Sequence, residues 1–305
     1  YYSNTKVKKV YYDNTLVWSS SYEKHSSTST TNLAITYYTY NNHKGGSSSS
    51  YAFFSKGHSS SVGTAGNVTV FNKSLTKSNP TVSYLDKQCV SCENIGNYMV
   101  ANCGNVDDPN NTSYNWACEV YNLSSLTKSY ASVSGHVGYS PFSGNINNQI
   151  AIFSGTGEYN HFVYLDTSLT GYYVNTIYGI YSASSVSIPN YMLIGLINTS
   201  SSGSPINYLY TINSSLTFSR NTSLEFSVKR YSGAAESINN FALFAGGVNG
   251  GTYYNTVDVL NTSLTRSNGA SLSTTKASMA SAHTSNYVMF GGGNPKTNLA
   301  IDIYD

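Results

Sequence analysis

Few side chains in this sequence could carry out acid–base or nucleophilic chemistry. The chain has 14 Asp and Glu residues among 305. Glycoside hydrolysis needs two positioned carboxylates, and two of these acids, Asp258 and Asp302, stand at the same place in two copies of an internal repeat. That placement favours a structural role for both. We therefore expect no catalytic residue, and a carbohydrate-active enzyme is the least favoured interpretation.

Signatures of anion, metal and cofactor sites are weak. Three arginines could bind the carboxylate of an acidic sugar, but Arg220 and Arg230 are close in sequence and Arg266 follows a repeat turn, so we do not expect them to converge. The six histidines show no paired metal-ligand spacing, and no glycine-rich phosphate loop occurs. We expect no cofactor and no bound metal.

The four cysteines fall in one short stretch of the chain, at Cys89, Cys92, Cys103 and Cys118. The C-x-x-C pair formed by the first two could belong to a zinc site, but the second half of the stretch lacks a matching pair. A disulfide also stays open. We favour small buried residues in the core of one sheet.

The side chains best suited to ligand binding are aromatic residues beside amides in variable loops. The candidates are Tyr114, Trp116, Tyr159, His161, Tyr253 and Tyr254. Flat rings offer contact area and stacking surfaces, while Asn and Ser offer hydrogen bonds. Packing of the same rings within the fold is an equally good explanation for each of them.

The composition excludes several classes of protein. Net charge is +2 and no basic stripe occurs, so nucleic acid is not an expected partner. No apolar run approaches the length of a membrane span, so we expect no membrane insertion. The chain begins with Tyr1 and shows no signal-peptide pattern, which suggests a processed chain or part of a longer one.

An internal repeat predicts the architecture that positions these residues. A short string of the form N/D-x-S-L-T recurs about 40 to 50 residues apart. Its copies are Asn72-Lys-Ser-Leu75-Thr, Leu123-Ser-Ser-Leu126-Thr, Asp166-Thr-Ser-Leu169-Thr, Asn213-Ser-Ser-Leu216-Thr and Asn261-Thr-Ser-Leu264-Thr. Side chains of Asn, Asp and Ser bond nearby backbone groups, so each string predicts a hairpin turn.

A second marker repeats out of phase with the first. It is a short apolar run bounded by Gly, as in Phe241-Ala-Leu-Phe244 and Tyr287-Val-Met-Phe290, and it occurs six times. Such runs are typical of buried strands. Alternating runs such as Val257-Asp-Val-Leu260 predict a further strand between the two markers. Four strands in each period predict the blade of a β-propeller.

Matching the markers at the two chain ends predicts how a ring would close. The last copy stops at Ile301-Asp-Ile-Tyr-Asp305, and the missing turn and strand resemble Asp13-Asn-Thr-Leu-Val-Trp18. We predict an all-β, six-bladed propeller of four-stranded blades in one domain, residues 1–305. Its closing strand lies at about residues 7–19, and six repeats cover about residues 20–305. Residues 7–12 would extend the closing strand or duplicate the strand before it.

The two last copies resemble kelch repeats. Phe244-Ala-Gly-Gly247 precedes Asn255-Thr-Val-Asp-Val, and Phe290-Gly-Gly-Gly293 precedes Asn298-Leu-Ala-Ile-Asp-Ile-Tyr-Asp305. Leu stands where kelch blades usually carry Trp. The chain looks like divergent kelch-type propellers of bacterial surface and phage virion proteins. The resemblance implies a fold rather than an activity. Because catalytic signatures are weak and aromatic residues occur in the loops, we expect a non-catalytic adhesion module for glycans or a protein partner, outside the cell or on a virion; the alternative is a structural subunit that self-assembles into a fibre or particle.

Four N-x-S/T sequons lie in the predicted hairpin turns, at Asn72, Asn122, Asn213 and Asn261. Sequons are about as frequent in this chain as chance predicts, so their number carries no information. The turns are exposed positions, and these four asparagines are the possible glycosylation sites.

Overall fold

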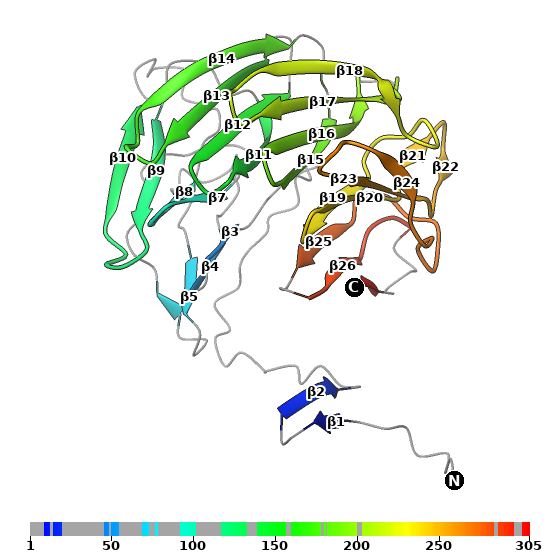
Figure 1. Ribbon diagram of the computed structural model, residues 1–305, viewed down its shortest axis with the longest axis horizontal. Helices are drawn as coiled ribbons and strands as arrows, with labels where there is room; N and C mark the ends of the chain where they lie inside the picture. Colours follow the sequence, from blue (N-terminus) through cyan, green and yellow to red (C-terminus); the bar gives the residue numbers. More distant parts are fainter. Residues whose placement is uncertain are drawn as a thin grey trace, which may run out of the picture. The chain divides into compact units, whose positions relative to one another are not determined.

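The computed structural model describes residues 9–12, 15–19, 46–48, 50–54, 69–72, 77–78, 92–101, 117–132, 139–156, 160–177, 180, 182–199, 203–283, 286–295 and 301–305. This part of the chain contains strands and turns and no helix, so no helix in it could span a membrane. Two compact units occur, Tyr1–Ile35 and Thr36–Asp305. The expected all-β class is confirmed (Figure 1).

The second unit contains six antiparallel sheets in chain order. The first five have four strands each and the last has three described strands. The sheets are β3 (Gly46–Ser47), β4 (Tyr51–Phe54), β5 (Thr69–Asn72) and β6 (Lys77–Ser78); β7 (Cys92–Ile95), β8 (Tyr98–Ala101), β9 (Ala117–Asn122) and β10 (Lys128–Ser132); β11 (Tyr139–Ile146), β12 (Ile150–Thr156), β13 (Asn160–Asp166) and β14 (Gly171–Ile177); β15 (Ser182–Ile188), β16 (Tyr191–Asn198), β17 (Tyr208–Asn213) and β18 (Phe218–Glu225); β19 (Ala234–Ile238), β20 (Phe241–Ala245), β23 (Val257–Asn261) and β24 (Arg266–Asn268); and β25 (Ala280–His283), β26 (Val288–Gly291) and β27 (Ile301–Tyr304). A small hairpin of β21 (Val248–Asn249) and β22 (Thr252–Tyr253) extends the fifth sheet's loop.

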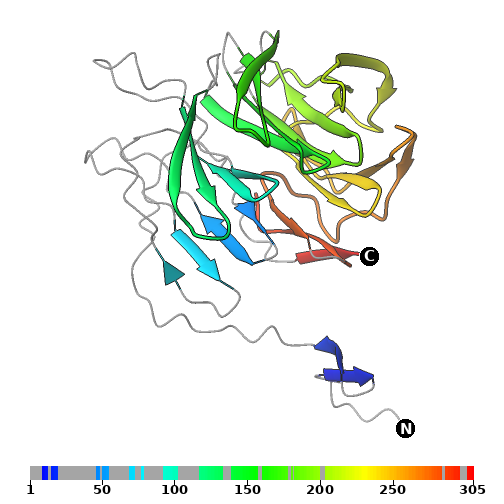
Figure 2. The same cartoon turned by 60° about the vertical axis from the view of Figure 1, so that its left-hand side comes forward.

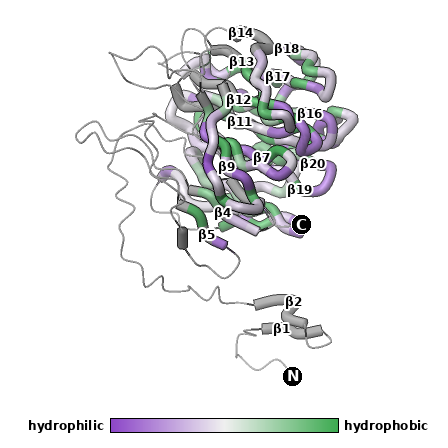
Figure 3. The backbone as a smooth tube through the Cα atoms, turned by 90° about the vertical axis from the view of Figure 1, so that its left-hand side faces the viewer, coloured by the Kyte–Doolittle hydropathy of each residue, from purple (hydrophilic) through white to green (hydrophobic). Residues whose placement is uncertain are grey.

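Strands follow one another in space as they do in sequence. In each sheet the first strand pairs with the second, the second with the third, and the third with the fourth where that strand is described. The predicted apolar runs form the second strand: β16 is buried from Met192 to Asn198, and β20 from Ala242 to Ala245. Hydrophobic and hydrophilic residues alternate along many of the strands, as Figure 3 shows.

Successive sheets pack face to face and share five apolar cores (Figure 2). For example, Phe142 and Phe162 of the third sheet meet Met192 and Ile212 of the fourth. The first strands of successive sheets also contact one another, from β3 through β7, β11, β15 and β19 to β25. This arrangement is compatible with propeller blades.

The recurring turn between the third and fourth strands folds as predicted. In the fourth sheet, the Oδ1 atom of Asn213 accepts hydrogen bonds from the backbone N–H groups of Ser215 at 3.0 Å and Thr217 at 2.9 Å. The Leu216 N–H donates to the Asn213 carbonyl at 2.9 Å. Asn261 and Asp166 make the equivalent contacts in their own sheets. The side chain at the head of the string thus closes the turn.

In the four strings whose leucine is described, that leucine has a left-handed backbone. The φ angles are 55° at Leu126, 62° at Leu169, 59° at Leu216 and 58° at Leu264. Three-residue hairpin loops end with such a residue, commonly Gly, and a left-handed conformation costs a β-carbon-bearing residue roughly 1–2 kcal/mol. Each leucine packs against the core shared with the preceding sheet. Burial of the side chain offsets the strain.

The N-terminal unit contains one described hairpin. Its strand β1 (Lys9–Tyr12) pairs antiparallel with β2 (Thr15–Ser19). Closure of a ring by pairing residues 13–18 with β27 would join two units that are described separately. The six-bladed closed ring and the single-domain assignment therefore stay predictions.

The turn asparagine can be tested by substitution. We expect Asn213→Ala to lower the free energy of unfolding by about 1 kcal/mol, because two backbone donors lose their partner. Asn213→Asp should have little effect, since Asp166 makes the same contacts. Urea denaturation measures both, and equal destabilisation by the two variants would contradict this role for the side-chain oxygen.

Candidate functional site

Each sheet of the second unit has two ends with different connections. At one end lie the turns between strands one and two and between strands three and four; in the second sheet these are residues 96–97 and 123–127. We call this end the turn face. At the other end lie the connections between strands two and three, which in the fifth sheet cover residues 246–256, and we call it the loop face.

Two of the predicted ligand-binding residues, Tyr253 and Tyr254, belong to the loop face. Tyr114, Trp116 and Tyr159 lie outside the described residues, and only the backbone of His161, in β13, is described. Tyr253 is in β22, and its hydroxyl accepts a 2.7 Å hydrogen bond from the side chain of Asn294 in the next sheet. Tyr254 is partly buried, and its N–H donates to the Gly247 carbonyl at 2.9 Å. Tyr253 thus joins two neighbouring sheets, and a ligand-binding role for the set stays a prediction.

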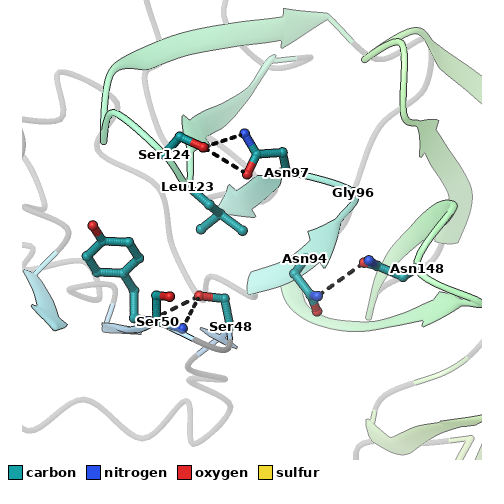
Figure 4. A pocket seen from close by; sticks show the side chains of 9 residues that line it. Ser48, Ser50, Asn94, Gly96, Asn97, Leu123, Ser124 and Asn148 are labelled. Atoms are coloured by element: carbon teal, nitrogen blue, oxygen red, sulfur yellow. Dashed lines mark hydrogen bonds between the residues drawn. The ribbon is translucent and has the colours of Figure 1, made fainter. Parts of the chain in front are cut away.

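A pocket of about 540 Å³ opens instead on the turn face. It lies where turns of the first three sheets meet (Figure 4). Its lining residues are Ser48, Ser50, Tyr51, Asn94, Gly96, Asn97, Leu123, Ser124 and Asn148. None of these nine carries a charge, and most offer an amide or a hydroxyl group.

One wall of the pocket is held by a chain of amides that begins at a buried acid. Glu93, only 7% exposed, accepts hydrogen bonds from Ser143 at 2.9 Å and from Asn145 at 3.3 Å. The same Asn145 amide approaches Oδ1 of Asn94 at 3.4 Å. The Asn94 amide then donates to Oδ1 of Asn148 at 3.1 Å (Figure 4). These contacts fix the orientation of the Asn94 amide, because its nitrogen and its oxygen each have a partner.

The opposite wall comes from a single sheet. The amide of Asn97 donates to the Ser124 hydroxyl at 3.0 Å, and the Leu123 N–H donates to the Asn97 carbonyl at 2.8 Å. Ser48 accepts from the Tyr51 N–H at 3.1 Å and supports the third side. The turn residue Gly96 has a φ of 51°, which favours glycine there. The polar groups are therefore pre-oriented by their own turns.

The chemistry of this pocket suits an uncharged polar ligand. Amides and hydroxyls both donate and accept hydrogen bonds, while Tyr51 and Leu123 offer apolar contact. Ligand sites commonly combine an apolar surface with a few fixed polar groups. A sugar, with hydroxyls around an apolar ring face, presents both features.

Sequence reasoning missed this pocket because it sought aromatic residues in variable loops. The residues that form it are short polar side chains in the turns, which normally need no functional explanation. The available signal was the recurrence of an amide just before the second strand, at Asn97, Asn190, Asn240 and Asn286.

The two recurring acids form ion pairs. Both oxygens of Asp258 are bound, by Arg230 and Arg266, each at 2.8 Å, and Asp302 is bound by Lys276 at 2.8 Å. Arg230 and Lys276 are both fully buried. The Arg230 guanidinium also donates to the Gly246 carbonyl at 2.6 Å and the Phe244 carbonyl at 3.1 Å. These contacts give the acids the structural role that their repeated position predicts.

Burial and charge act against each other at these pairs. Burial lowers the pKa of Arg230, and the neighbouring Asp258 carboxylate opposes that shift. Burial also raises the pKa of Asp302, but hydrogen bonds from Lys276 and Ser273 outweigh it and keep this pKa below its usual value. The Lys276–Asp302 pair thus contributes stability at neutral pH, which is lost as the pH falls through the pKa of Asp302.

The three arginines that could have formed an anion site are each engaged elsewhere. Two of the three arginines bind Asp258, and Arg220 stacks over the Tyr208 ring at 4.2 Å, so the three do not converge. No group of three potential metal ligands occurs among the described residues.

The described cysteines are buried core residues, as expected, and one of them also realises the open alternative. Cys92 is buried in its reduced form, and Cys118 is buried but disulfide-bonded. Cys89 and Cys103 lie outside the described residues. The sequence could not decide this, because cysteine spacing does not reveal which thiols meet in a fold.

The buried pair predicts a large effect on stability. We expect Asp258→Asn to lower the free energy of unfolding by about 3–5 kcal/mol, because it leaves Arg230 buried without a countercharge. The fourth sheet carries Ile180 and Tyr210 at the corresponding sequence positions, so Arg230→Ile combined with Asp258→Tyr should be the milder change. Urea denaturation compares the two, and a double variant less stable than Asp258→Asn would contradict this account.

No protein-family model matches this sequence, and no curated protein is significantly similar to it. Function must therefore be argued from the chain's own residues. Those residues combine a neutral pocket on the turn face with recurring acids that are engaged in ion pairs.

Proposed function

We propose that the chain is a non-catalytic binding or adhesion module that recognises glycans through the turn-face pocket. The observation that carries this proposal is the lining of the pocket, which offers amides and hydroxyls and no charge. The engagement of Asp258 and Asp302 in ion pairs adds support, because neither acid is left available as a proton donor.

We place this activity outside the cell, on a microbial surface or a virion appendage. The disulfide at Cys118 supports an oxidising compartment. The low charge content, 10% of residues, fits a surface that recognises neutral polymers rather than nucleic acid.

A structural subunit of an extracellular fibre or particle is the second candidate. It is favoured by large apolar side chains at the surface of the described residues. Tyr130 is 52% exposed, and Tyr172, Phe241 and Tyr287 are each 45% exposed. Aromatic residues are enriched at protein interfaces, so these positions suit contact with a protein partner.

For the fold, we propose a closed, six-bladed kelch-type propeller. The motif at Asp13-Asn-Thr-Leu16 supplies the turn signature and fourth strand that the last sheet lacks among its described strands. Val257, the counterpart of Ile301, is 1% exposed in its complete sheet, whereas Ile301 is 55% exposed. A fourth strand beside β27 would give the last sheet the composition of the other five.

Closure can be tested by cross-linking. In the fifth sheet Val259 pairs with Ser267, and the same spacing from the turn residue aligns Ile303 with Ser19. We expect Ile303→Cys combined with Ser19→Cys to form an intramolecular disulfide under mild oxidation, seen by mass spectrometry of peptides. The matched pair Ile303→Cys and Thr15→Cys should form little, and equal yields from both pairs would contradict this register.

Glycan binding can be tested by arrays and calorimetry. We expect the isolated chain to bind neutral glycans on an array, and Asn97→Ala to weaken the best hit at least tenfold, because Asn97 shapes one pocket wall. Asn240→Ala is the matched control, since it changes the same turn position outside the pocket.

Three outcomes would contradict this assignment. Absence of any array signal would remove the glycan proposal, and equal weakening by the control would remove the pocket from it. Loss of binding in Tyr253→Ala with full binding in Asn97→Ala would move the site to the loop face.

A further inference from the structure

The outer strands of the five four-stranded sheets differ in one respect, which is charge. Every outer strand ends its sheet, so one row of its backbone groups faces away from the neighbouring strand. Basic residues occur in four of the five, at Lys77 in β6, Lys128 in β10, Arg220 in β18 and Arg266 in β24. The strand β14, Gly-Tyr-Tyr-Val-Asn-Thr-Ile, contains no charged residue.

In three of the four charged strands the basic residue stands at the same position. Lys77, Lys128 and Arg266 each pair with the residue that precedes the turn asparagine of their sheet. The corresponding pair is Leu165 with Gly171 in the third sheet and Ile212 with Phe218 in the fourth, where Arg220 follows two residues later. Charges on edge strands are a common device that prevents sheets from joining edge to edge, and of the five outer strands only β14 lacks a charge along its whole length.

The open edge of β14 is suited to pairing. Among the described residues, β14 pairs only with β13. The Asp166 N–H donates to the Thr170 carbonyl at 3.4 Å, so the alternation of an antiparallel ladder turns the peptide groups of Gly171 and Tyr173 towards the open side. Tyr172 is 45% exposed and stacks on Tyr164 with ring centres 5.2 Å apart. The edge therefore combines backbone donors and acceptors with a fixed aromatic surface.

We propose that two copies of this chain associate through β14, antiparallel, about a two-fold axis. In such a pair every residue of the strand occurs twice in one short contact, so a charged residue would bring two like charges into it, and like charges that face each other are destabilising. The absence of charge selects β14 over the other four outer strands for this contact. The contact adds main-chain hydrogen bonds between the third sheets and is independent of the glycan pocket, whose lining includes no residue of β14.

The test introduces into β14 the charge that the other sheets carry. We expect analytical ultracentrifugation of the wild-type chain to show a dimer whose fraction rises with concentration. Gly171→Lys should make the chain monomeric, and so should Tyr172→Lys, which changes an exposed side chain and keeps the fold if the glycine substitution does not. Ser219→Lys, in the already charged strand β18, is the matched control and should dimerise like the wild type.

Amide hydrogen exchange gives an independent readout. Exchange at Gly171 and Tyr173 should slow as the protein concentration rises in the wild type and in Ser219→Lys, but not in the folded β14 variants. A wild-type chain that stays monomeric up to about 0.5 mM, about five hundredfold above a dissociation constant of 1 μM, would overturn the proposal. Dimers that persist unchanged in Gly171→Lys and Tyr172→Lys would overturn it as well.

Discussion

A four-stranded sheet in this chain has two faces, and neither can bury its apolar residues within the sheet. Each face must pack against a neighbouring sheet, as the five shared cores show. The rest of the structure depends on this constraint. Because successive sheets must cover one another, the repeat that encodes each sheet is short. The left-handed leucines place their side chains in the core shared with the preceding sheet. The same packing brings turns of three sheets together at the pocket.

The sequence was most informative where a repeat and a local rule agreed. The strings headed by Asp166, Asn213 and Asn261 predicted hairpin turns closed by a side chain, and all three fold so. The pocket could not be predicted, because Ser48, Asn94 and Asn148 come from three sheets and only tertiary packing brings them together. The disulfide of Cys118 was left as an open alternative for the same reason, since sequence spacing does not give distances in space.

Repeats also show how buried charge is handled. The acids Asp258 and Asp302 stand three residues before the turn position of their sheets, and each is paired with a buried cation. In the fourth sheet, Tyr210 takes the position of Asp258, and the buried Ile180 takes the position of Arg230. Equivalent positions therefore hold either a complete ion pair or two uncharged residues, because a buried charge without its partner is strongly destabilising. Such acids are poor guides to catalysis.

The side-chain closure of the hairpin turns has a consequence for how the chain folds. The hydrogen bonds of Asn213 reach only two and four residues ahead, so this turn and the register of β17 with β18 are specified without any other sheet. Hairpins form in microseconds, whereas contacts between distant segments are slower. Each sheet can therefore begin to form at its own turn during synthesis. Its apolar face becomes buried later, when the next sheet packs against it.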